Sequence, residues 1–156
     1  LKQYGYKTCA IVGSAGLYRG LNIGQGFDDY NDEFLPPKIA DPSLYVGDTK
    51  VFRLAERVSE LALQWISENK DSQFFLWLHY WDTHSPYAAP EPFYNMYDPN
   101  YKGFVKGATK DYQRPDLTSQ DINHLIALYD GEITYVDYHL GKLFEALRKN
   151  LEILFL

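Results

Sequence analysis

Two histidines and an aspartate occur within six residues, directly after a strongly apolar run. The run at residues 74–78 has the length of a β-strand and no polar alternation, so it predicts a strand covered on both faces. The polarity changes at His79, and Pro86 ends any regular structure. Ligands of open α/β sheets usually bind just past the carboxyl ends of buried strands. The pattern therefore predicts a ligand site at the turn that carries His79, Asp82 and His84.

These residue types suit acid–base chemistry. Imidazole exchanges a proton near neutral pH, and a neighbouring carboxylate can hold its ring in one orientation. A pair of histidines carries no unique chemistry, however. The spacing is equally compatible with His79 as a hydrogen-bonded core residue and His84 as an ordinary loop residue.

Three segments resemble the sulfatases of the alkaline phosphatase superfamily, in the family's order. The first is QGFDDYND at residues 25–32. The second is HYWDTHSPY at residues 79–87, with its apolar run before it and APEPF after it. The third is LYDGEITYVDYHLGKLFEAL at residues 128–147. Together they place nearly the whole chain within the family's pattern, so residues 1–156 resemble a single, partial sulfatase catalytic domain.

The resemblance implies hydrolysis of a sulfate ester of a small molecule or a glycan. By its match to the H-x-P part of the turn, His84 resembles the family histidine that contacts the sulfate or its leaving oxygen. His84 is thus the candidate catalytic residue, and Asp82, His79 and Tyr87 are the candidate substrate-binding residues. Asp82 would orient His84 or line the pocket, and His79 would support the site from behind. Thr83 stands where many relatives have proline, which changes the stiffness of the turn.

Family members use a formylglycine nucleophile, made from the first residue of a C/S-x-P/A-S-R motif, and a divalent metal, usually calcium. Cys9 is followed by Ala-Ile-Val, so it is interpreted as a small buried apolar residue and not as the nucleophile. The family's paired acidic residues and its D-H/N-G motif are also missing. The resemblance implies that formylglycine and the Ca²⁺ ligands lie outside this chain. We therefore expect an internal fragment that has no metal ligands of its own and is inactive alone.

Composition argues against several other classes of protein. A net charge of −6 disfavours general nucleic-acid binding. One cysteine excludes an intrachain disulfide framework and a cysteine-rich zinc site. No stretch approaches transmembrane length. The length of 156 residues suits one compact unit, and a hydrophobic share of 46% argues against disorder.

The elements that position the turn predict an α/β fold, with a mostly parallel or mixed central sheet flanked by helices. By resemblance this sheet is alkaline-phosphatase-like and incomplete. Short apolar runs predict strands near residues 8–12, 74–80 and 152–156. The acidic segment at residues 28–33 lacks the spacing of a calcium-binding loop and is interpreted as a solvated turn.

Two long helices are expected to flank the sheet. The first runs from Asp48 or Thr49 to about Asn69, and its short connection to the next strand is typical of α/β proteins. The second runs from Thr118 or Ser119 to about Lys149. Its apolar residues alternate steps of four and three and are Ile122, Ile126, Tyr129, Ile133, Val136, Leu140, Leu143 and Leu147. Four polar residues lie off this seam and are interpreted as structural and solvent-facing: Asp130, Glu132, Asp137 and His139.

Three hypotheses about function stay open at this point. The first is a sulfuric-ester hydrolase. The second keeps the superfamily but changes the reaction to phosphate- or phosphonate-ester hydrolysis or phosphotransfer. The third is a non-catalytic domain that binds a sulfated or phosphorylated ligand or a partner protein. A C/S-x-P/A-S-R motif in the complete protein would favour the first, and a bare Thr or Ser nucleophile would favour the second.

Overall fold

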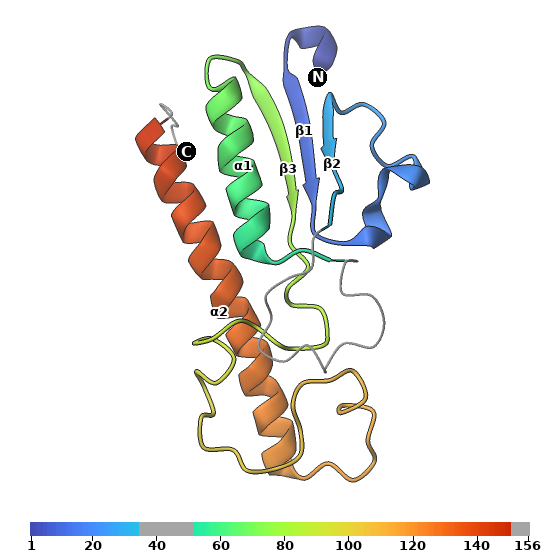
Figure 1. The fold of residues 1–156 in the computed structure, drawn as a ribbon, viewed down its shortest axis with the longest axis vertical. Helices are drawn as coiled ribbons and strands as arrows, with labels where there is room; N and C mark the ends of the chain where they lie inside the picture. The colour runs from blue at the N-terminus through green and yellow to red at the C-terminus, as the bar shows by residue number, and fades with distance from the viewer. Residues whose placement is uncertain (35–51, 151–156) are drawn as a thin grey trace.

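The computed structural model describes residues 1–34 and 52–150 of the chain. At its centre is a three-stranded parallel sheet in the order β2–β1–β3 (Figure 1). The strands are β1 (Lys7–Val12), β2 (Asp29–Asn31) and β3 (Phe74–His79). The predicted α/β fold with a parallel sheet is confirmed. The expected strand at residues 152–156 lies outside the described residues.

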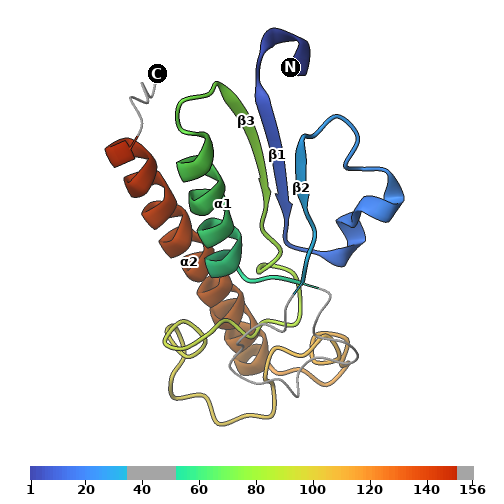
Figure 2. The same cartoon turned by 45° about the horizontal axis from the view of Figure 1, so that its top comes forward.

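Both long helices pack on the same face of the sheet. They are α1 (Ala55–Asn69) and α2 (Ser119–Asn150), and they lie side by side in both views (Figures 1 and 2). The core between helices and sheet contains Cys9, Ile11, Val58, Ala62, Trp65, Ile66 and Leu143. Burial of each large apolar side chain contributes about 1.5–3 kcal/mol, so this layer is the main source of stability for the sheet.

The other face of β3 is more exposed than the sequence predicts. Phe75 is 43% exposed, and the ring of Phe27 stacks on Phe75 and Trp77 at centroid distances of 6.1 Å and 6.0 Å. The prediction of a strand buried on both faces is therefore wrong for the part of the chain that the structure describes. An unbroken apolar run indicates that both faces of a strand can be buried. It does not indicate whether helices or loops cover both faces.

The acidic segment at residues 28–33 contains β2, so its interpretation as a solvated turn is wrong. Asp28 accepts hydrogen bonds from the backbone N–H and the hydroxyl of Thr8, both at 2.9 Å. Asp29 accepts a hydrogen bond from the indole N–H of Trp65 at 2.7 Å. A strand of three residues is too short to show a periodic pattern, and its carboxylates are satisfied by partners distant in sequence.

Helix α1 begins later than predicted. Phe52 pairs with Ser14 in an antiparallel bridge, and the N–H of Arg53 donates to the Gly13 carbonyl at 2.8 Å. The buried guanidinium of Arg53 donates to the Val12 carbonyl at 3.0 Å. These contacts hold residues 52–54 outside the helix, which starts at Ala55. The predicted first residues, Asp48 and Thr49, lie outside the described residues.

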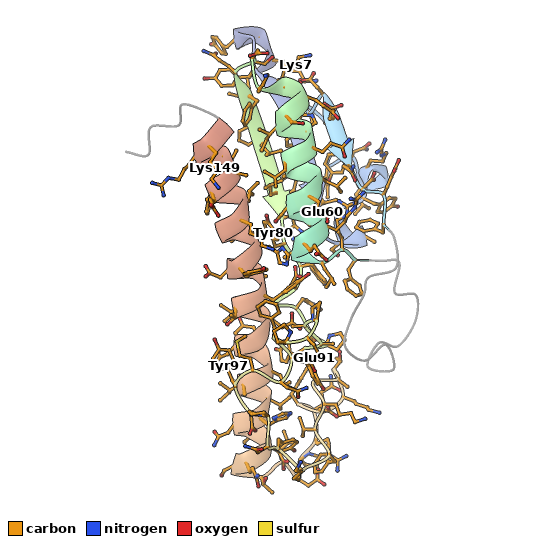
Figure 3. All side chains as sticks on the ribbon, turned by 60° about the vertical axis from the view of Figure 1, so that its left-hand side comes forward. Lys7, Glu60, Tyr80, Glu91, Tyr97 and Lys149 are labelled. Atoms are coloured by element: carbon orange, nitrogen blue, oxygen red, sulfur yellow. The ribbon has the colours of Figure 1, made fainter. Side chains whose placement is uncertain are left out.

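The N-terminal half of α2 extends past the sheet and packs against the loops of residues 85–111, whose side chains fill the space beside it (Figure 3). The predicted bounds of this helix are confirmed within one residue. The buried face of this half is not the predicted apolar seam. Four residues of that seam are exposed here: Ile122, Ile126, Tyr129 and Ile133. Glu132 and His139, expected to face solvent, are buried. The loops supply backbone N–H groups to that face, so a polar residue can be satisfied there.

Two glycines of α2 are expected to respond oppositely to alanine. A Cβ at Gly141 meets nothing within 4 Å, so Gly141→Ala should raise the free energy of unfolding by about 0.5–1 kcal/mol through helix propensity. A Cβ at Gly131 would lie 2.5 Å from the backbone oxygen of Phe93. Gly131→Ala should therefore lower the free energy by about 2 kcal/mol. Parallel denaturant titrations check this, and equal changes would mean that the Phe93 loop does not rest on α2.

Candidate active site

The predicted site lies where β1 and β3 end together. Val12 and His79 are register partners, so Gly13 and the turn after β3 meet at the carboxyl edge of the sheet. The N–H of Gly13 donates to Nδ1 of His79 at 3.3 Å. A Cβ on Gly13 would lie 2.6 Å from the His79 carbonyl oxygen, so this close approach requires glycine.

His79 is held as a neutral ring within this contact. Because Nδ1 accepts the Gly13 N–H, the proton of the neutral imidazole is on Nε2. Burial lowers the pKa of His79 below its ordinary value. These observations assign His79 a role in joining the two strand ends, and its predicted part in substrate binding stays a prediction.

His84, unlike His79, is exposed to solvent. Its ring stacks on Trp81, with centroids 3.9 Å apart and planes 20° apart. Nδ1 lies 2.7 Å from the carbonyl oxygen of Ser85. A carbonyl can only accept, so Nδ1 carries a proton and Nε2 is the atom available to a ligand. Within the described residues, Nε2 has no hydrogen-bond partner. The stack and the Nδ1 bond therefore hold the ring in place and leave its second nitrogen available to a ligand.

Asp82 is almost completely buried below the turn. Its Oδ1 accepts the N–H of Ala55, the first residue of α1, at 2.7 Å. Burial raises the pKa of Asp82 to about 6, although the N–H groups of Ala55, Asp82 and Trp81 act in the opposite direction. Its Oδ2 is buried without a partner among the described residues. No hydrogen bond there joins Asp82 to His84, so the geometry supports an anchoring role for Asp82 in the turn.

Tyr87 leads from the turn into a cavity. Its N–H donates to the Gly107 carbonyl at 2.8 Å, and its ring packs edge-on to Tyr129 at 5.4 Å. Burial raises the pKa of its phenol. The cavity, of about 290 Å³, is lined by Tyr87, Tyr112, Ile122, Leu125, Ile126 and Tyr129. Tyr112 connects the cavity to the turn, because its hydroxyl lies 2.9 Å from the Ser85 hydroxyl.

Sequence reasoning missed two residues that shape the turn. Trp81 supplies the stacking surface for His84, and Glu132 of α2 accepts the N–H of Ala88 at 2.6 Å. Trp81 lies inside the quoted motif and could have been found as an aromatic neighbour of His84. Glu132 is within the third resembling segment, but nothing in the helix pattern indicates that it reaches the turn.

The described residues do not fit a metal ion or a cysteine nucleophile. Among residues 1–34 and 52–150 there is no group of three or more His, Cys, Asp or Glu side chains that could hold a metal. Cys9 is buried, and its burial raises the thiol pKa to about 12, so it is a poor nucleophile near neutral pH.

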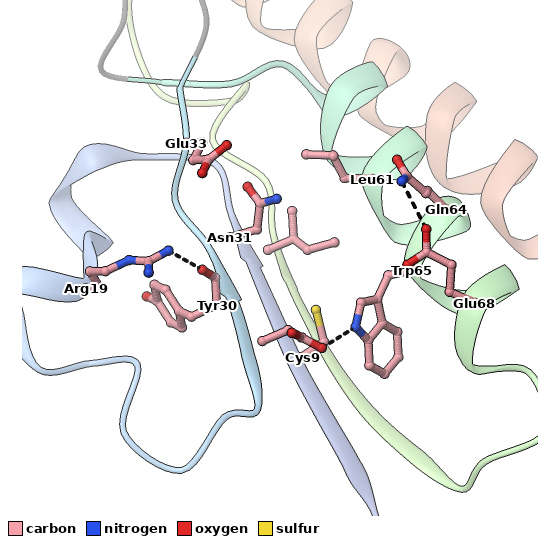
Figure 4. A pocket seen from close by; sticks show the side chains of 11 residues that line it. Cys9, Arg19, Tyr30, Asn31, Glu33, Leu61, Gln64, Trp65 and Glu68 are labelled. Carbon is pink, nitrogen blue, oxygen red and sulfur yellow. Dashed lines mark hydrogen bonds between the residues drawn. The ribbon is translucent and has the colours of Figure 1, made fainter.

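A second cavity lies away from the histidine turn. It has a volume of about 260 Å³ between β2 and α1 (Figure 4). Arg19, Glu33 and Gln64 are among its polar lining residues, and none of the predicted site residues reaches it. The turn at the carboxyl edge therefore remains the candidate active site.

The fold and the turn agree with a comparison against known protein families, in which the sulfatase family matches residues 1–153. The chain belongs to the sulfatase family. The match spans all three resembling segments and supports a function of the sulfate-ester hydrolase type. A search of curated proteins finds no match for this sulfatase-family chain. Within its described residues, no helix is long and apolar enough to span a membrane.

Proposed function

We propose that this chain supplies the histidine-bearing part of an arylsulfatase-like enzyme that hydrolyses sulfuric esters of small molecules or glycans. The observation that carries the proposal is the state of His84, an exposed ring fixed by Trp81 and by the Ser85 carbonyl. In this proposal a formylglycine nucleophile and the ligands of a calcium ion are contributed by residues outside these 156. The chain alone is then inactive.

His84 performs the proton transfer in this reaction. As the sulfuryl group passes to the nucleophile that this proposal places outside the chain, the S–O bond to the alcohol breaks and its electron pair stays on the departing oxygen. An alkoxide is a poor leaving group in water. The Nε2–H of a protonated His84 donates to that oxygen as the bond breaks, so the alcohol leaves neutral. The carbonyl of Ser85 accepts the Nδ1–H and holds the ring in one orientation, so Nε2 is the nitrogen left for the transfer. A positioned acid of this kind typically accelerates a reaction by about 10²–10⁴-fold.

The experiment is a substrate panel with the full-length protein. An aryl sulfate, the matching aryl phosphate and a phosphonate monoester share a leaving group and differ in the group transferred. We expect kcat/KM to be highest for the sulfate ester. Preference for either phosphorus ester would favour the phosphotransfer branch of the superfamily. Binding of the sulfate without turnover of any of the three would favour a ligand-binding domain.

A further inference from the structure

Glu132 is a buried acid that connects α2 to the segment leaving the histidine turn. Its side chain is 2% exposed, and Oε1 accepts the N–H of Ala88 at 2.6 Å. The N–H of Ala89 acts on the same carboxyl group. Ala88 follows Tyr87 directly and is four residues beyond His84. The carboxyl of Glu132 therefore fixes the backbone on one side of the catalytic candidate.

Asp82 fixes the backbone on the other side. Its Oδ1 binds the first N–H of α1 at 2.7 Å. His84 thus lies on a short segment clamped at Asp82 to α1 and at Ala88 to α2. Between these clamps, the hydroxyl of Ser85 contacts the side chain of Tyr112, and Trp81 stacks on the imidazole. Loosening either clamp would free the turn to change the direction of Nε2.

The two clamps are both carboxyl groups in a poorly solvated interior. Burial raises the pKa of Glu132, and the charge of Asp82 in the turn raises it further, to about 8, although the N–H groups of Ala88 and Ala89 act in the opposite direction. The charge of Glu132 also raises the pKa of two neighbouring phenols, Tyr87 of the loop and Tyr135 of α2. Neither phenol can supply a positive charge to offset it. Glu56 of α1 acts on Tyr135 and not on Glu132. Among the described residues no cation acts on Glu132, so a charged Glu132 within reach of a charged Asp82 would be strongly unfavourable.

We propose that Glu132 is a positioning residue for His84, and that it acts as a neutral carboxylic acid which binds residues 88–89 to α2. In this form it accepts the backbone N–H groups without adding a second negative charge next to Asp82. When Glu132 loses its proton, its charge repels that of Asp82. The two side chains then move apart, and residues 88–89 are released from α2. The effect on turnover rests on the proposed function, whereas the effect on the imidazole does not.

The direction of the pH dependence follows from the raised pKa. An acid with a folded-state pKa above its unfolded value stabilises the fold fully below the unfolded value, near 4.5 for Glu. That stabilisation is lost as the pH rises through the folded value. Order in the turn should therefore decline as the pH rises from about 5 to above 8, and this decline should be absent when residue 132 cannot ionise.

The test uses the full-length protein with histidines labelled at Cε1, and Glu132→Gln, Glu132→Ala and Asp137→Asn as variants. Because the His84 ring lies on Trp81, its Cε1–H resonance should be displaced upfield by the indole ring current. We expect this displacement to be lost above about pH 8 in the unmodified protein and at all pH values in Glu132→Ala. Glu132→Gln should keep it throughout. Asp137 is exposed on the same helix, so Asp137→Asn should behave like the unmodified protein.

Kinetics provide the second readout. Glu132→Ala should lower kcat/KM for the sulfate ester by about tenfold or more, and Glu132→Gln should restore it to within about twofold and extend activity to higher pH. If no sulfate ester is turned over but the resonances behave as described, the proposed function fails and the positioning role stands. If Glu132→Ala fails to fold, the Glu132→Gln titration decides. A pH-dependent loss of the displacement that persists unchanged in Glu132→Gln would overturn the positioning role.

Discussion

Replacing His84 by alanine is expected to lower kcat of the full-length protein by on the order of a hundredfold or more. In the proposed reaction the imidazole donates a proton to an oxygen that becomes basic only as the S–O bond breaks, so its contribution would be larger in the transition state than in the ground state. KM should change much less than kcat. Steady-state kinetics with an alkyl or carbohydrate sulfate, whose alkoxide needs protonation, measure the effect.

His79→Ala is the matched control for this substitution, since it removes the same side chain from the end of β3, the strand that leads into the turn. The ring of His79 accepts the Gly13 N–H between two strand ends, so its loss should lower thermal stability at least as clearly as turnover. His84 is exposed, and His84→Ala should leave the melting temperature almost unchanged. Equal and mild kinetic losses in both variants would mean that His84 is not the catalytic histidine.

Gly13→Ala is expected to cause the largest loss of stability, about 3 kcal/mol or more. The added Cβ would lie 2.6 Å from the His79 carbonyl oxygen and 3.1 Å from the Trp81 backbone nitrogen. Both are backbone atoms of the segment that carries the site, so neither can rotate away as a side chain would. The strands must separate at their carboxyl ends, and His84 loses its support on Trp81.

Gly16→Ala provides a control three residues further along the same connection. A Cβ added at Gly16 would have the Ser14 hydroxyl as its nearest neighbour, at 3.5 Å, which is an ordinary van der Waals distance. Denaturant unfolding of the two variants should therefore differ by at least about 2 kcal/mol. A Gly13→Ala protein as stable as Gly16→Ala would show that β1 and β3 do not approach as closely as described.

Strands β1 and β3 and both bounds of α2 follow directly from the sequence. Unbroken apolar runs identify the strands, steps of four and three identify the helix, and each element ends at a recognisable change in polarity. The position of the histidine turn at the carboxyl edge follows in the same way, because it depends on where β3 stops. These features are local, so local patterns contain them.

The features that the sequence did not predict depend on contacts between distant residues. Asp29 belongs to a strand because β1 and Trp65 satisfy its backbone and side chain, and neither partner is near it in the chain. Glu132 is buried because Ala88 presents an N–H to it from 44 residues away. A carboxylate on a helix normally indicates a solvated face, and no periodicity distinguishes one that is satisfied internally. The state of His79 is also set by a distant partner, Gly13, whereas the ring of His84 is held by its own sequence neighbours Trp81 and Ser85.

A series of sulfate esters with different leaving groups tests the proposed protonation of the leaving oxygen by His84. The measurement is kcat/KM of the unmodified protein and of His84→Ala for sulfate esters whose parent alcohols range from strongly to weakly acidic. The ratio of the two values should approach one for the most acidic alcohols, which leave without protonation, and should rise steadily as the alcohol becomes less acidic. A ratio that is the same for every leaving group would contradict the proton transfer assigned to His84.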